Sequence, residues 1–343
     1  MTTAPSHPPA THALFFSVVV PSRGNEATLV PLLEVLAAQT FDRERYEVIV
    51  ALDGARMPPA AATRAASIGA RVLELPSRRG PGATRNRAAA AANGLYLAFT
   101  EDDVVPDRDW LERAAAHLEA DTQVDVLEGT TVKPDQRTAD LKPGDPPIYL
   151  PTNLFVRREL FEAVGGYCED FFDAARGIYF REDSDLGFTL EDAGARVERQ
   201  PTARVVHPRE NLGYRDPLRW ARRYEMDALL EARHPILFRE RIEVQHIGPF
   251  RLRRPIPRAC LVFVAAVIAA AALGAFGFVD GAIALGVIAA LALVPIWAKW
   301  RFDPLRLPVI AVLPFVMVVA LWRGRSRARG VAASPPPKPV VSA

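Results

Sequence analysis

Cysteine is scarce in this sequence, and charge of one sign is not in excess. Cys168 and Cys260 lie far apart, without the close spacing of metal ligands, which disfavours a disulfide framework or a zinc site. The net charge is only +2 at pH 7, so the composition gives no global case for nucleic acid as a partner. Residues 1–13 lack a basic segment followed by a long apolar run, so we expect a disordered lead rather than a secretory signal.

Apolar residues concentrate toward the end of the chain. Residues 259–322 are mostly Ala, Val, Leu and Ile, whereas residues 14–247 carry many charges and have the composition of a globular domain. A chain of 343 residues suggests about two domains, at ~150 residues each. The last stretch, 323–343, is basic and then Pro-rich, and we expect its end to be disordered.

Between residues 14 and 99, apolar segments rich in β-branched residues alternate with segments of helical periodicity. We expect strands at 14–20, 46–52, 71–75 and 95–99, and helices at 28–39, 60–68 and 83–92. This alternation predicts an α/β fold with a mainly parallel sheet and helices on both faces. Ligands of such sheets bind beyond the carboxyl ends of the strands, where the polar loops 21–26, 53–54 and 101–103 fall.

Three consecutive acids, Glu101, Asp102 and Asp103, follow the strand expected at 95–99. Their like charges repel one another. In one interpretation they hold Mg²⁺ or Mn²⁺ bridging to a phosphate, because hard cations prefer oxygen ligands. In the other they form a solvated acidic turn.

Three other polar positions also have alternative interpretations. Asp53 at a strand end could accept a hydrogen bond from a nucleobase N–H, or it could form an Asx turn with Gly54. Arg79 and Arg85 flank a Gly-rich helix start, where positive side chains and free backbone N–H groups suit a diphosphate. The alternative for each arginine is an ordinary solvated surface position.

Four segments carry a family resemblance: VVVPSRGNEATL, the strand ending in LDG, RRGPGATRNRAA and LYLAFTEDDVVPDRDWL. In this order and spacing they resemble family 2 glycosyltransferases, over about residues 14–235. The resemblance implies the GT-A fold, a nucleotide-binding α/β sheet with an Asp-x-Asp motif that holds a divalent cation. The nucleotide pocket it implies is lined by Pro21, Arg23, Glu26 and Asp53, with Arg79, Arg85 and Asn86 nearby.

The metal motif departs from the family pattern at one position. Asp103 matches its last carboxylate, but Glu101 stands where Asp is usual. Glu is longer by one methylene, so either Glu101 or Asp102 could complete the site. The resemblance implies Mg²⁺ or Mn²⁺ as the cofactor and a nucleotide-diphosphate sugar as the donor.

The acceptor side follows. We expect a strand at 124–131, a polar Pro-rich loop at 134–147, a strand at 149–156 and then a helix that ends at Gly165–Gly166. The strand and helix resemble the acceptor segment of the family, in which Asn153 would face the cleft. An ordinary polar residue on a strand is the alternative for Asn153.

A second acidic group, Glu182, Asp183 and Asp185, begins a helix expected to end at Gly194. Acids in a first helical turn are favoured by the helix dipole alone. The match to the family's Glu-Asp-x-Asp-Leu segment instead indicates a general base, which inverting sugar transfer needs to remove the acceptor proton. The resemblance assigns the base to Asp183, with Glu182 and Asp185 as alternates.

Three more positions come from the resemblance. His207 follows a short strand at 203–207 and could be a third metal ligand or a packed surface histidine. Arg219 and Trp220 match half of the Gln-x-x-Arg-Trp motif that holds the acceptor end and diphosphate in processive members. Asp216 stands at the Gln position, which disfavours processive polymerisation.

Three uncharged runs follow, at 259–279, 281–298 and 307–322. The first two are long enough to span a bilayer, and the third, which contains two prolines, is short and could be tilted or re-entrant. We expect Asp280–Gly281 to end the first span and to separate it from the second. Arginines before the first span and Lys299 and Arg301 after the second place both flanks in the cytoplasm by the positive-inside rule. A third full span would export the arginines at 323–329, against that rule.

Together these patterns predict a membrane-anchored inverting glycosyltransferase, multi-pass in the cell membrane with a cytoplasmic catalytic domain. It would transfer the sugar to a hydroxyl or a phosphate of a membrane-bound acceptor, such as a polyprenyl phosphate, another membrane lipid or a lipid-linked glycan. Its parts would be a lead (1–13), a GT-A domain (14–247), a basic juxtamembrane segment (248–258), two or three membrane helices (259–322) and a tail (323–343). A catalytically inactive nucleotide-sugar-binding or scaffold protein is the main alternative. A transporter with a regulatory domain ranks last, because the spans contain no charged residue.

Overall fold

The computed structural model describes residues 14–133, 146–208, 213–247 and 250–329. They form two compact units, of which the first comprises described residues from 14 to 169 and from 189 to 208, and the second the remainder. The predictions for the lead, for most of the loop at 134–147 and for the end of the tail lie outside the described residues.

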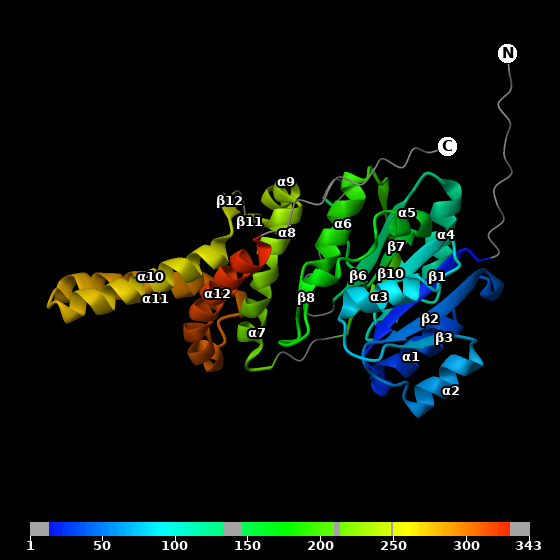
Figure 1. The fold of residues 1–343 in the computed structure, drawn as a ribbon, viewed down its shortest axis with the longest axis horizontal. Helices are drawn as coiled ribbons and strands as arrows, with labels where there is room; N and C mark the ends of the chain where they lie inside the picture. Colours follow the sequence, from blue (N-terminus) through cyan, green and yellow to red (C-terminus); the bar gives the residue numbers. More distant parts are fainter. Residues whose placement is uncertain (1–13, 134–145, 209–212, 248–249, 330–343) are drawn as a thin grey trace, which may run out of the picture. The chain divides into compact units, whose positions relative to one another are not determined.

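The core of the first unit is an eight-stranded sheet, counted over the described residues (Figure 1). Its strands, in order across the sheet, are β3 (Arg71–Glu74), β2 (Tyr46–Leu52), β1 (Phe16–Ser22), β4 (Tyr96–Phe99), β7 (Leu154–Arg157), β6 (Val126–Val132), β10 (Val197–Val206) and β5 (Val105–Pro106). The first four pair in parallel, as do β6 and β10. β7 runs antiparallel to both neighbours, and β5 runs antiparallel to β10. The predicted mainly parallel α/β sheet is confirmed.

β1 runs farther than the sequence predicts, through Pro21 to Ser22. Its pairing with β4 ends at Val19, whereas its pairing with β2 continues to Ser22. The strand therefore has one neighbour at Pro21, which explains why a residue without an N–H donor is tolerated there. The extra residues carry the end of β1 toward the loop that contains the acids.

Helices cover the sheet of the first unit. They are α1 (Glu26–Ala37), α2 (Pro59–Ser67), α3 (Pro81–Ala89), α4 (Trp110–Ala120) and α5 (Arg158–Ala163). The leucine face predicted for the first helix is buried against the sheet, at Leu29, Leu32, Leu33 and Leu36. Each buried leucine contributes about 1.5–3 kcal/mol relative to an exposed one. The side chain of Asn25 caps α1 by accepting from the Ala27 amide, so the helix start beside the end of β1 is fixed locally.

The second unit consists of small polar elements and long apolar helices. In chain order they are β8 (Phe172–Asp173), β9 (Ile178–Tyr179), the start of α6 (Glu182–Asp192), α7 (Asp216–Arg223), the 3₁₀ turn η3 (Tyr224–Met226), α8 (Asp227–Arg233), α9 (Pro235–Leu237), β11 (Val244–Ile247), β12 (Phe250–Arg253), α10 (Pro255–Ala275), α11 (Val279–Lys299) and α12 (Leu307–Ala328). Strands β8 and β9 form one antiparallel hairpin, and β11 and β12 form another.

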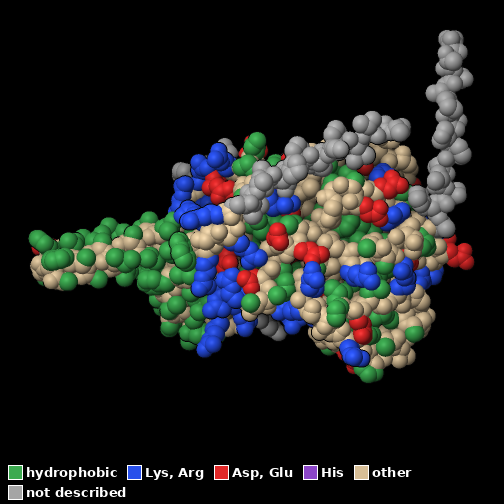
Figure 2. Space-filling view, viewed as in Figure 1, with side chains coloured by type: hydrophobic (Ala, Val, Ile, Leu, Met, Phe, Trp, Pro, Cys, Tyr) green, Lys and Arg blue, Asp and Glu red, His purple; other side chains and the backbone are tan. Residues whose placement is uncertain are grey.

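Within the described part of the chain, three helices are long and apolar enough to cross a membrane. Two of them, α10 and α11, lie side by side as a hairpin (Figure 1) whose surface is covered by hydrophobic side chains (Figure 2). Lys and Arg side chains gather near the base of this hairpin (Figure 2). The break between the helices lies at 276–278 rather than at Asp280–Gly281, with Gly277 at φ +80°. Asp280 instead occupies the first turn of α11, where the helix dipole favours an acid.

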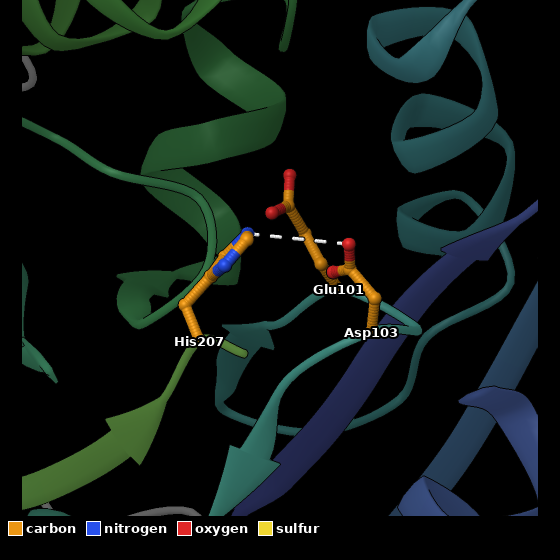
Figure 3. Close-up of side chains that lie close together, drawn as sticks. All are labelled: Glu101, Asp103 and His207. Atoms are coloured by element: carbon orange, nitrogen blue, oxygen red, sulfur yellow. Dashed lines mark ion pairs between the residues drawn. The ribbon is translucent and has the colours of Figure 1, made fainter. Parts of the chain in front are cut away.

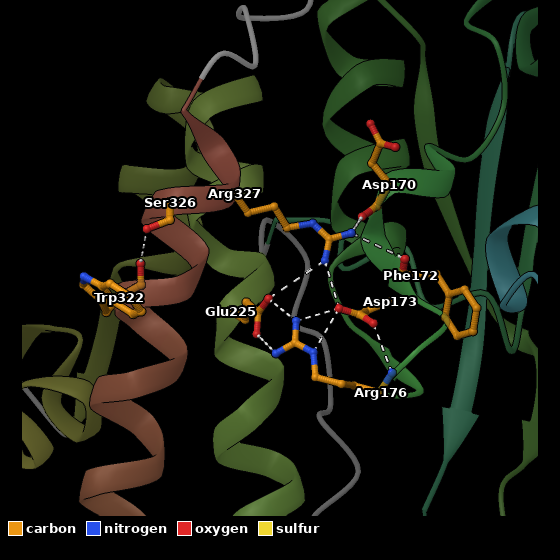
Figure 4. A network of polar contacts seen from close by, with 8 residues as sticks. All are labelled: Asp170, Phe172, Asp173, Arg176, Glu225, Trp322, Ser326 and Arg327. Atoms are coloured by element: carbon orange, nitrogen blue, oxygen red, sulfur yellow. Dashed lines mark hydrogen bonds and ion pairs between the residues drawn. The ribbon is translucent and has the colours of Figure 1, made fainter.

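The third apolar helix, α12, packs along α7 and α8 of the same unit (Figure 1). Just before its start, the Arg306 guanidinium donates to the Gly213 carbonyl at 3.2 Å. Near its end, Arg327 donates to the Asp170 carbonyl at 3.0 Å (Figure 4). Gly324 lies so close to η3 that an added Cβ would collide with the Glu225 carbonyl. Both ends of α12 therefore contact polar segments of the second unit.

Candidate active site

A cluster of possible metal ligands lies at the carboxyl edge of the first unit's sheet (Figure 3). It consists of Glu101, Asp103 and His207, each with one ligand atom within 4.8 Å of the others. The acids follow β4 and the histidine follows β10, which are not neighbouring strands. The short strand β5, two residues after Asp103, pairs with the last residues of β10, and this ladder brings the acids beside the histidine.

The histidine is oriented as a metal ligand would be. His207 Nδ1 lies 2.9 Å from the Pro208 carbonyl oxygen, which can only accept, so we assign the proton to Nδ1. Nε2 then presents its lone pair toward Asp103, whose Oδ2 is 4.0 Å away. Two carboxylates and one neutral imidazole form a donor set that fits Mn²⁺ or Mg²⁺. The predicted cluster of Asp103, Glu101 and His207 thus comes together in the structure.

Arg85 acts on the first acid of this cluster. It is buried on α3, donates to Glu101 Oε1 at 2.8 Å and lies over the Tyr167 ring, 5.4 Å from its centroid. Burial raises the pKa of Glu101, and the adjacent guanidinium partly offsets that rise. Arg85 therefore favours the ionised form of Glu101, which is the form that binds metal. The predicted contact of Arg85 with a diphosphate stays a prediction.

The middle acid points elsewhere. Asp102 accepts a hydrogen bond from the hydroxyl of Ser22 at the end of β1. Burial raises the pKa of Asp102, and the bond from Ser22 opposes that rise. The ligand cluster contains Glu101 rather than Asp102, which favours Glu101 as the partner of Asp103.

Asp53 fixes the Gly-rich turn that begins α3. Its carboxylate accepts from the backbone N–H of Arg79 at 2.6 Å and of Gly80 at 3.2 Å. Gly80 is the N-cap of α3 with φ +88°, a conformation that favours glycine. Among the described residues, the Asp53 carboxylate accepts from these two amides rather than from the Ala55 amide two residues on, so the Asx turn considered for this position is not formed.

Two other residues predicted for the nucleotide site, Arg79 and Asn86, form contacts with neighbouring segments of the protein. The side chain of Arg79 pairs with Glu169 at 2.8 Å, and both are well exposed. The Asn86 amide donates to the Tyr167 carbonyl at 2.8 Å and accepts from the Tyr167 amide at 2.9 Å. These bonds tie α3 to the segment after Gly165–Gly166. A nucleotide contact for either residue stays a prediction.

The loop after β1 carries three further predicted residues. Pro21 is half-buried at the end of the strand, and Arg23 is exposed beyond it. Glu26 is exposed and accepts from the Ala60 amide at 3.2 Å, at the start of α2. Among these side chains, Arg23 forms no ion pair within the described residues, so it is the one most available to a phosphate.

Asn153 lies inside the core. It accepts from Trp110 Nε1 at 2.8 Å and donates to the Ala203 and Thr130 carbonyls at 2.8 and 3.1 Å. Only 2% of the residue is exposed. These contacts are structural, and they give no support to the predicted contact with the acceptor.

The three acids at the start of α6 differ in their surroundings. Asp185 is buried and is held by Arg233 at 2.5 Å and by His234 at 3.1 Å. Glu182 is also buried. Asp183 is half-buried, accepts from the Ser184 amide at 2.6 Å and pairs with no Lys or Arg among the described residues. Of the three, Asp183 is the acid best suited to accept a proton.

The residue before these acids has an unusual backbone. Arg181 has φ +74°, in the left-handed region that residues other than glycine rarely adopt. Its Nε donates to Asp227 at 2.8 Å, and Asp227 also accepts from Arg254. A strained residue that its neighbours hold in place is typical of functional sites. The clamp formed by Arg181, Asp227 and Arg254 therefore fixes the entry into α6.

The matched family agrees with this geometry. Residues 17–172 match the model described as "Glycosyl transferase family 2". This segment is a family 2 glycosyltransferase domain. The match covers Glu101, Asp103, Asp53 and the start of α3.

Named relatives of the domain are glycosyltransferases. The pre-mycofactocin glycosyltransferase of Mycobacterium tuberculosis is 31% identical over 225 residues, 60% of this chain and 44% of the relative. Glycosyltransferase AglE of Haloferax volcanii is 25% identical over 193 residues, 51% of this chain and 63% of the relative. This chain thus spans less than two thirds of the length of either relative.

Solved structures show the same fold. The mannosyltransferase PcManGT of Pyrobaculum calidifontis, in complex with GDP-Man and Mn²⁺, gives a TM-score of 0.62 at 23% identity over 92% of this chain and 88% of that chain. S. aureus TarS 1–349 in complex with UDP gives 0.51 at 17% identity, over 92% and 91%. The glycosyltransferase domain has the GT-A fold, as the sequence predicts.

Two residues predicted to lie on the acceptor side are in the second unit. Arg219 is exposed and pairs with Asp216 at 2.9 Å. Trp220 stacks edge-on against Tyr224, with ring centroids 4.7 Å apart, and the Lys299 amine lies 4.6 Å from its ring centroid. Trp220 therefore packs α7 against the end of α11, and its predicted contact with an acceptor stays a prediction.

Several contacts of the site have no signal in the sequence. Ser22 and Tyr167 were missed because each acts through a residue far away in the chain. The pairing of Arg181 with Asp227 was missed for the same reason. The position of Arg181 directly before the acidic segment was the one available indication.

Proposed function

We propose that this chain transfers a sugar, with inversion, from a nucleotide-diphosphate sugar to an acceptor. The observation that carries the proposal is the cluster of Glu101, Asp103 and His207 at the edge of a family 2 glycosyltransferase domain. The GDP-Man and Mn²⁺ complex of a protein of the same fold supports a nucleotide sugar and a divalent cation here.

Each group has a part in this chemistry. The cation, Mn²⁺ or Mg²⁺, offsets negative charge on the leaving diphosphate when bound. Glu101, Asp103 and His207 would hold it, and Arg85 favours the ionised form of Glu101. Asp183 removes the proton from an acceptor hydroxyl as the oxygen attacks the anomeric carbon. Asp53 contributes by fixing the turn at Gly80, whose following amides face the diphosphate.

We further propose that α10 and α11 cross the cell membrane and that residues 14–247 act as the catalytic domain in the cytoplasm. Arginines before α10 and Lys299 at the end of α11 agree with this orientation. The contacts of α12 at both ends support its placement along the membrane surface rather than across the bilayer. The arginines at 323–329 then stay in the cytoplasm, which removes the conflict with the positive-inside rule.

The acceptor follows from this placement. A catalytic domain held at the membrane surface by 248–258 and the α10–α11 hairpin reaches lipids and lipid-linked glycans directly. We therefore propose a membrane lipid or lipid-linked acceptor, with no nucleic acid involved.

The test is donor turnover by the full chain in detergent, over UDP-, GDP- and dTDP-sugars with Mn²⁺ or Mg²⁺. We expect metal-dependent release of the nucleotide diphosphate by the wild type and strong loss in Asp183→Asn. Asp192→Asn, an exposed acid at the other end of α6, is the matched control. Tight nucleotide binding without turnover of any donor would instead support a catalytically inactive scaffold protein.

A further inference from the structure

Two buried carboxylates of the second unit, Glu225 and Asp227, lie two positions apart where η3 passes into α8. Only 3% of Glu225 and 1% of Asp227 is exposed. Residues two positions apart on a helix do not face each other, so the two carboxylates contact different neighbours. A buried carboxylate needs a cationic partner, because an unpaired charge is costly in the protein interior. Each of these two acids lies near two arginines, which come from different elements.

Glu225 lies between the β8–β9 hairpin and the end of α12 (Figure 4). Arg176, in the turn of the hairpin, donates to Glu225 Oε2 at 2.6 Å and binds Asp173 at 2.6 Å. Arg327, in the last turn of α12, lies 3.9 Å from Glu225 and 3.5 Å from Asp173. The same arginine donates to the Asp170 carbonyl at 3.0 Å. The hairpin and the end of α12 therefore share one pair of carboxylates.

Asp227 makes a corresponding connection to α10. Arg181, directly before α6, donates to Asp227 Oδ1 at 2.8 Å, and Arg254, directly before α10, donates to Oδ2. Both arginines have a positive φ, +74° and +45°. Such a conformation persists only where the surrounding structure over-determines it. One carboxylate thus holds the residues from which two different helices begin.

The proposed base lies between two anchored residues of the same unit. Arg181 is held by Asp227, and Asp185 is held by the arginine and the histidine described above. The Asp185 amide also donates to the Arg181 carbonyl at 2.8 Å, which closes the first turn of α6 around Asp183. Asp183 pairs with no Lys or Arg among the described residues, so its direction depends on these two anchors.

A movement of α10 reaches this turn through Arg254. The helix has 21 residues, about 31 Å at 1.5 Å per residue, which is close to the ~30 Å hydrocarbon core of a bilayer. A thinner or thicker bilayer changes the tilt of such a helix. Because Arg254 is the N-cap of α10, a change of tilt moves the guanidinium that shares Asp227 with Arg181.

We propose that Glu225 and Asp227 are positioning residues, which tie the segment that carries Asp183 to α10 and α12, so that the placement of these helices at the membrane sets the orientation of Asp183. The inference rests on the proposed function, in which Asp183 is the base. Each acid joins an arginine of the segment 173–181 to an arginine at one end of an apolar helix. One arginine would neutralise Asp227, and the second fixes the start of α10 relative to the start of α6.

The first experiment measures amide hydrogen exchange at residues 185–188 of the full chain in phosphatidylcholine nanodiscs. Exchange there requires the first turn of α6 to open. We expect Arg254→Gln to speed this exchange at least tenfold, and Arg254→Lys, which keeps the charge, to recover part of the protection. Arg253→Gln is the matched control, because Arg253 is the neighbouring arginine but pairs with Glu243, and it should exchange as wild type.

The connection to α12 is tested in the same way. We expect Arg327→Gln to speed exchange at residues 172–179, the β8–β9 hairpin, at least threefold. Arg325→Gln, an exposed arginine in the same turn of α12, is its control and should leave this exchange unchanged. Equal effects of Arg327→Gln and Arg325→Gln would contradict the role of Glu225.

The second experiment separates positioning by the membrane from local stability. It compares nanodiscs of dimyristoyl and dierucoyl phosphatidylcholine, which form a thin and a thick bilayer. In the wild type, exchange at 185–188 should differ at least threefold between the two, because α10 tilts differently in each. In Arg254→Gln the two rates should be equal. A contact that serves stability alone predicts no dependence on the bilayer in either protein, and that result would overturn the proposal.

Turnover is scored separately from exchange. Asp183 acts on the acceptor, so Arg254→Gln should lower kcat for donor turnover at least tenfold with little change in the KM of the donor. Unchanged exchange in Arg254→Gln, an equal change in Arg253→Gln, or faster exchange with an unchanged kcat would each overturn the positioning role. Absence of turnover in the wild type would instead refute the proposed transferase, and the exchange experiments would still decide whether α10 and α12 anchor this segment.

Discussion

One acidic group in each unit shows two opposite uses of a carboxylate. In the second unit, Asp227 is buried between Arg181 and Arg254, so its charge is neutralised within the fold. In the first unit, Glu101 pairs with Arg85, and Asp103 lies 4.0 Å from His207, which is charged only when it is protonated. Acids with enough arginines around them hold the fold together, whereas acids left in excess are arranged for a cation from outside. Sequence motifs alone do not separate these two cases.

The largest effect on stability is expected at Asp227, whose charge is neutralised by two arginines within the fold. Asp227→Ala leaves Arg181 and Arg254 buried without their partner, and removing one member of a buried ion pair costs about 3–5 kcal/mol. We expect that loss in the free energy of unfolding, measured by denaturant titration in detergent. Mn²⁺ should not restore it. A loss below about 1 kcal/mol would mean that the clamp is not structural.

At the metal cluster, we expect activity to fall while stability is kept. Asp103→Asn removes a ligand, and we expect metal-dependent turnover to fall by about 10²–10³-fold because several kcal/mol of charge stabilisation is lost. Stability without metal should be unchanged or slightly higher, because repulsion between neighbouring acids is relieved. Asp109→Asn, an acid paired with Arg113, is the control. Equal metal dependence in wild type and Asp103→Asn would refute the assignment.

Arg85 connects the two cases, because it is an internal cation placed on a metal ligand. Arg85→Gln removes the guanidinium that opposes the burial-raised pKa of Glu101, so that pKa should rise further. Protons then compete with the cation for Glu101 up to a higher pH than in the wild type. We expect Mn²⁺ affinity at pH 7 to fall about tenfold, or ~1.4 kcal/mol, and the lower pH limit of metal binding to move upward. Metal titrations across pH 5–8 would show this, and an unchanged limit would contradict it.

The smallest effect concerns the buried hydroxyl of Tyr96, which is not part of the metal-ligand cluster. Burial raises the pKa of Tyr96 to about 12, from about 10 in an unfolded chain. The folded state prefers the neutral phenol. The stability that this preference contributes to the folded state is therefore complete below pH 10 and is lost as pH rises toward 12. At pH 11 the loss is about 1 kcal/mol.

Tyr96→Phe tests this sign. At pH 7 the variant should be about 1 kcal/mol less stable, because the hydrogen bond from Tyr96 to the Val124 carbonyl is lost. By pH 11 the difference should have largely vanished. A difference that stays constant from pH 8 to 11 would show that Tyr96 does not titrate in this range.

Local patterns predicted much of this fold. The strand at 46–52 is confirmed residue for residue, because a continuous apolar run is buried on both faces of a parallel sheet. β5 was not predicted, since two residues are too few for any periodicity. Asn153 and Asp53 received ligand interpretations because their actual partners, Trp110 and the Gly80 amide, are distant in sequence.

The acidic motif was predicted only in part. The order of Glu101, Asp102 and Asp103 after a strand is visible in the sequence, but the direction of each side chain is not. The contact of Asp102 with Ser22 depends on the extension of β1 past Pro21, which the sequence pattern does not predict.

The two-residue strand β5 links metal occupancy to local opening of the sheet edge. Asp103 and His207 are brought together by the pairing of Val105 with Val206 and of Pro106 with Val205. A ladder this short opens at low free-energy cost, and a cation bound to both sides resists that opening to the same extent that the ladder favours the cation. Saturating Mn²⁺ should therefore slow amide hydrogen exchange along this edge, which makes the edge strand a reporter of metal occupancy.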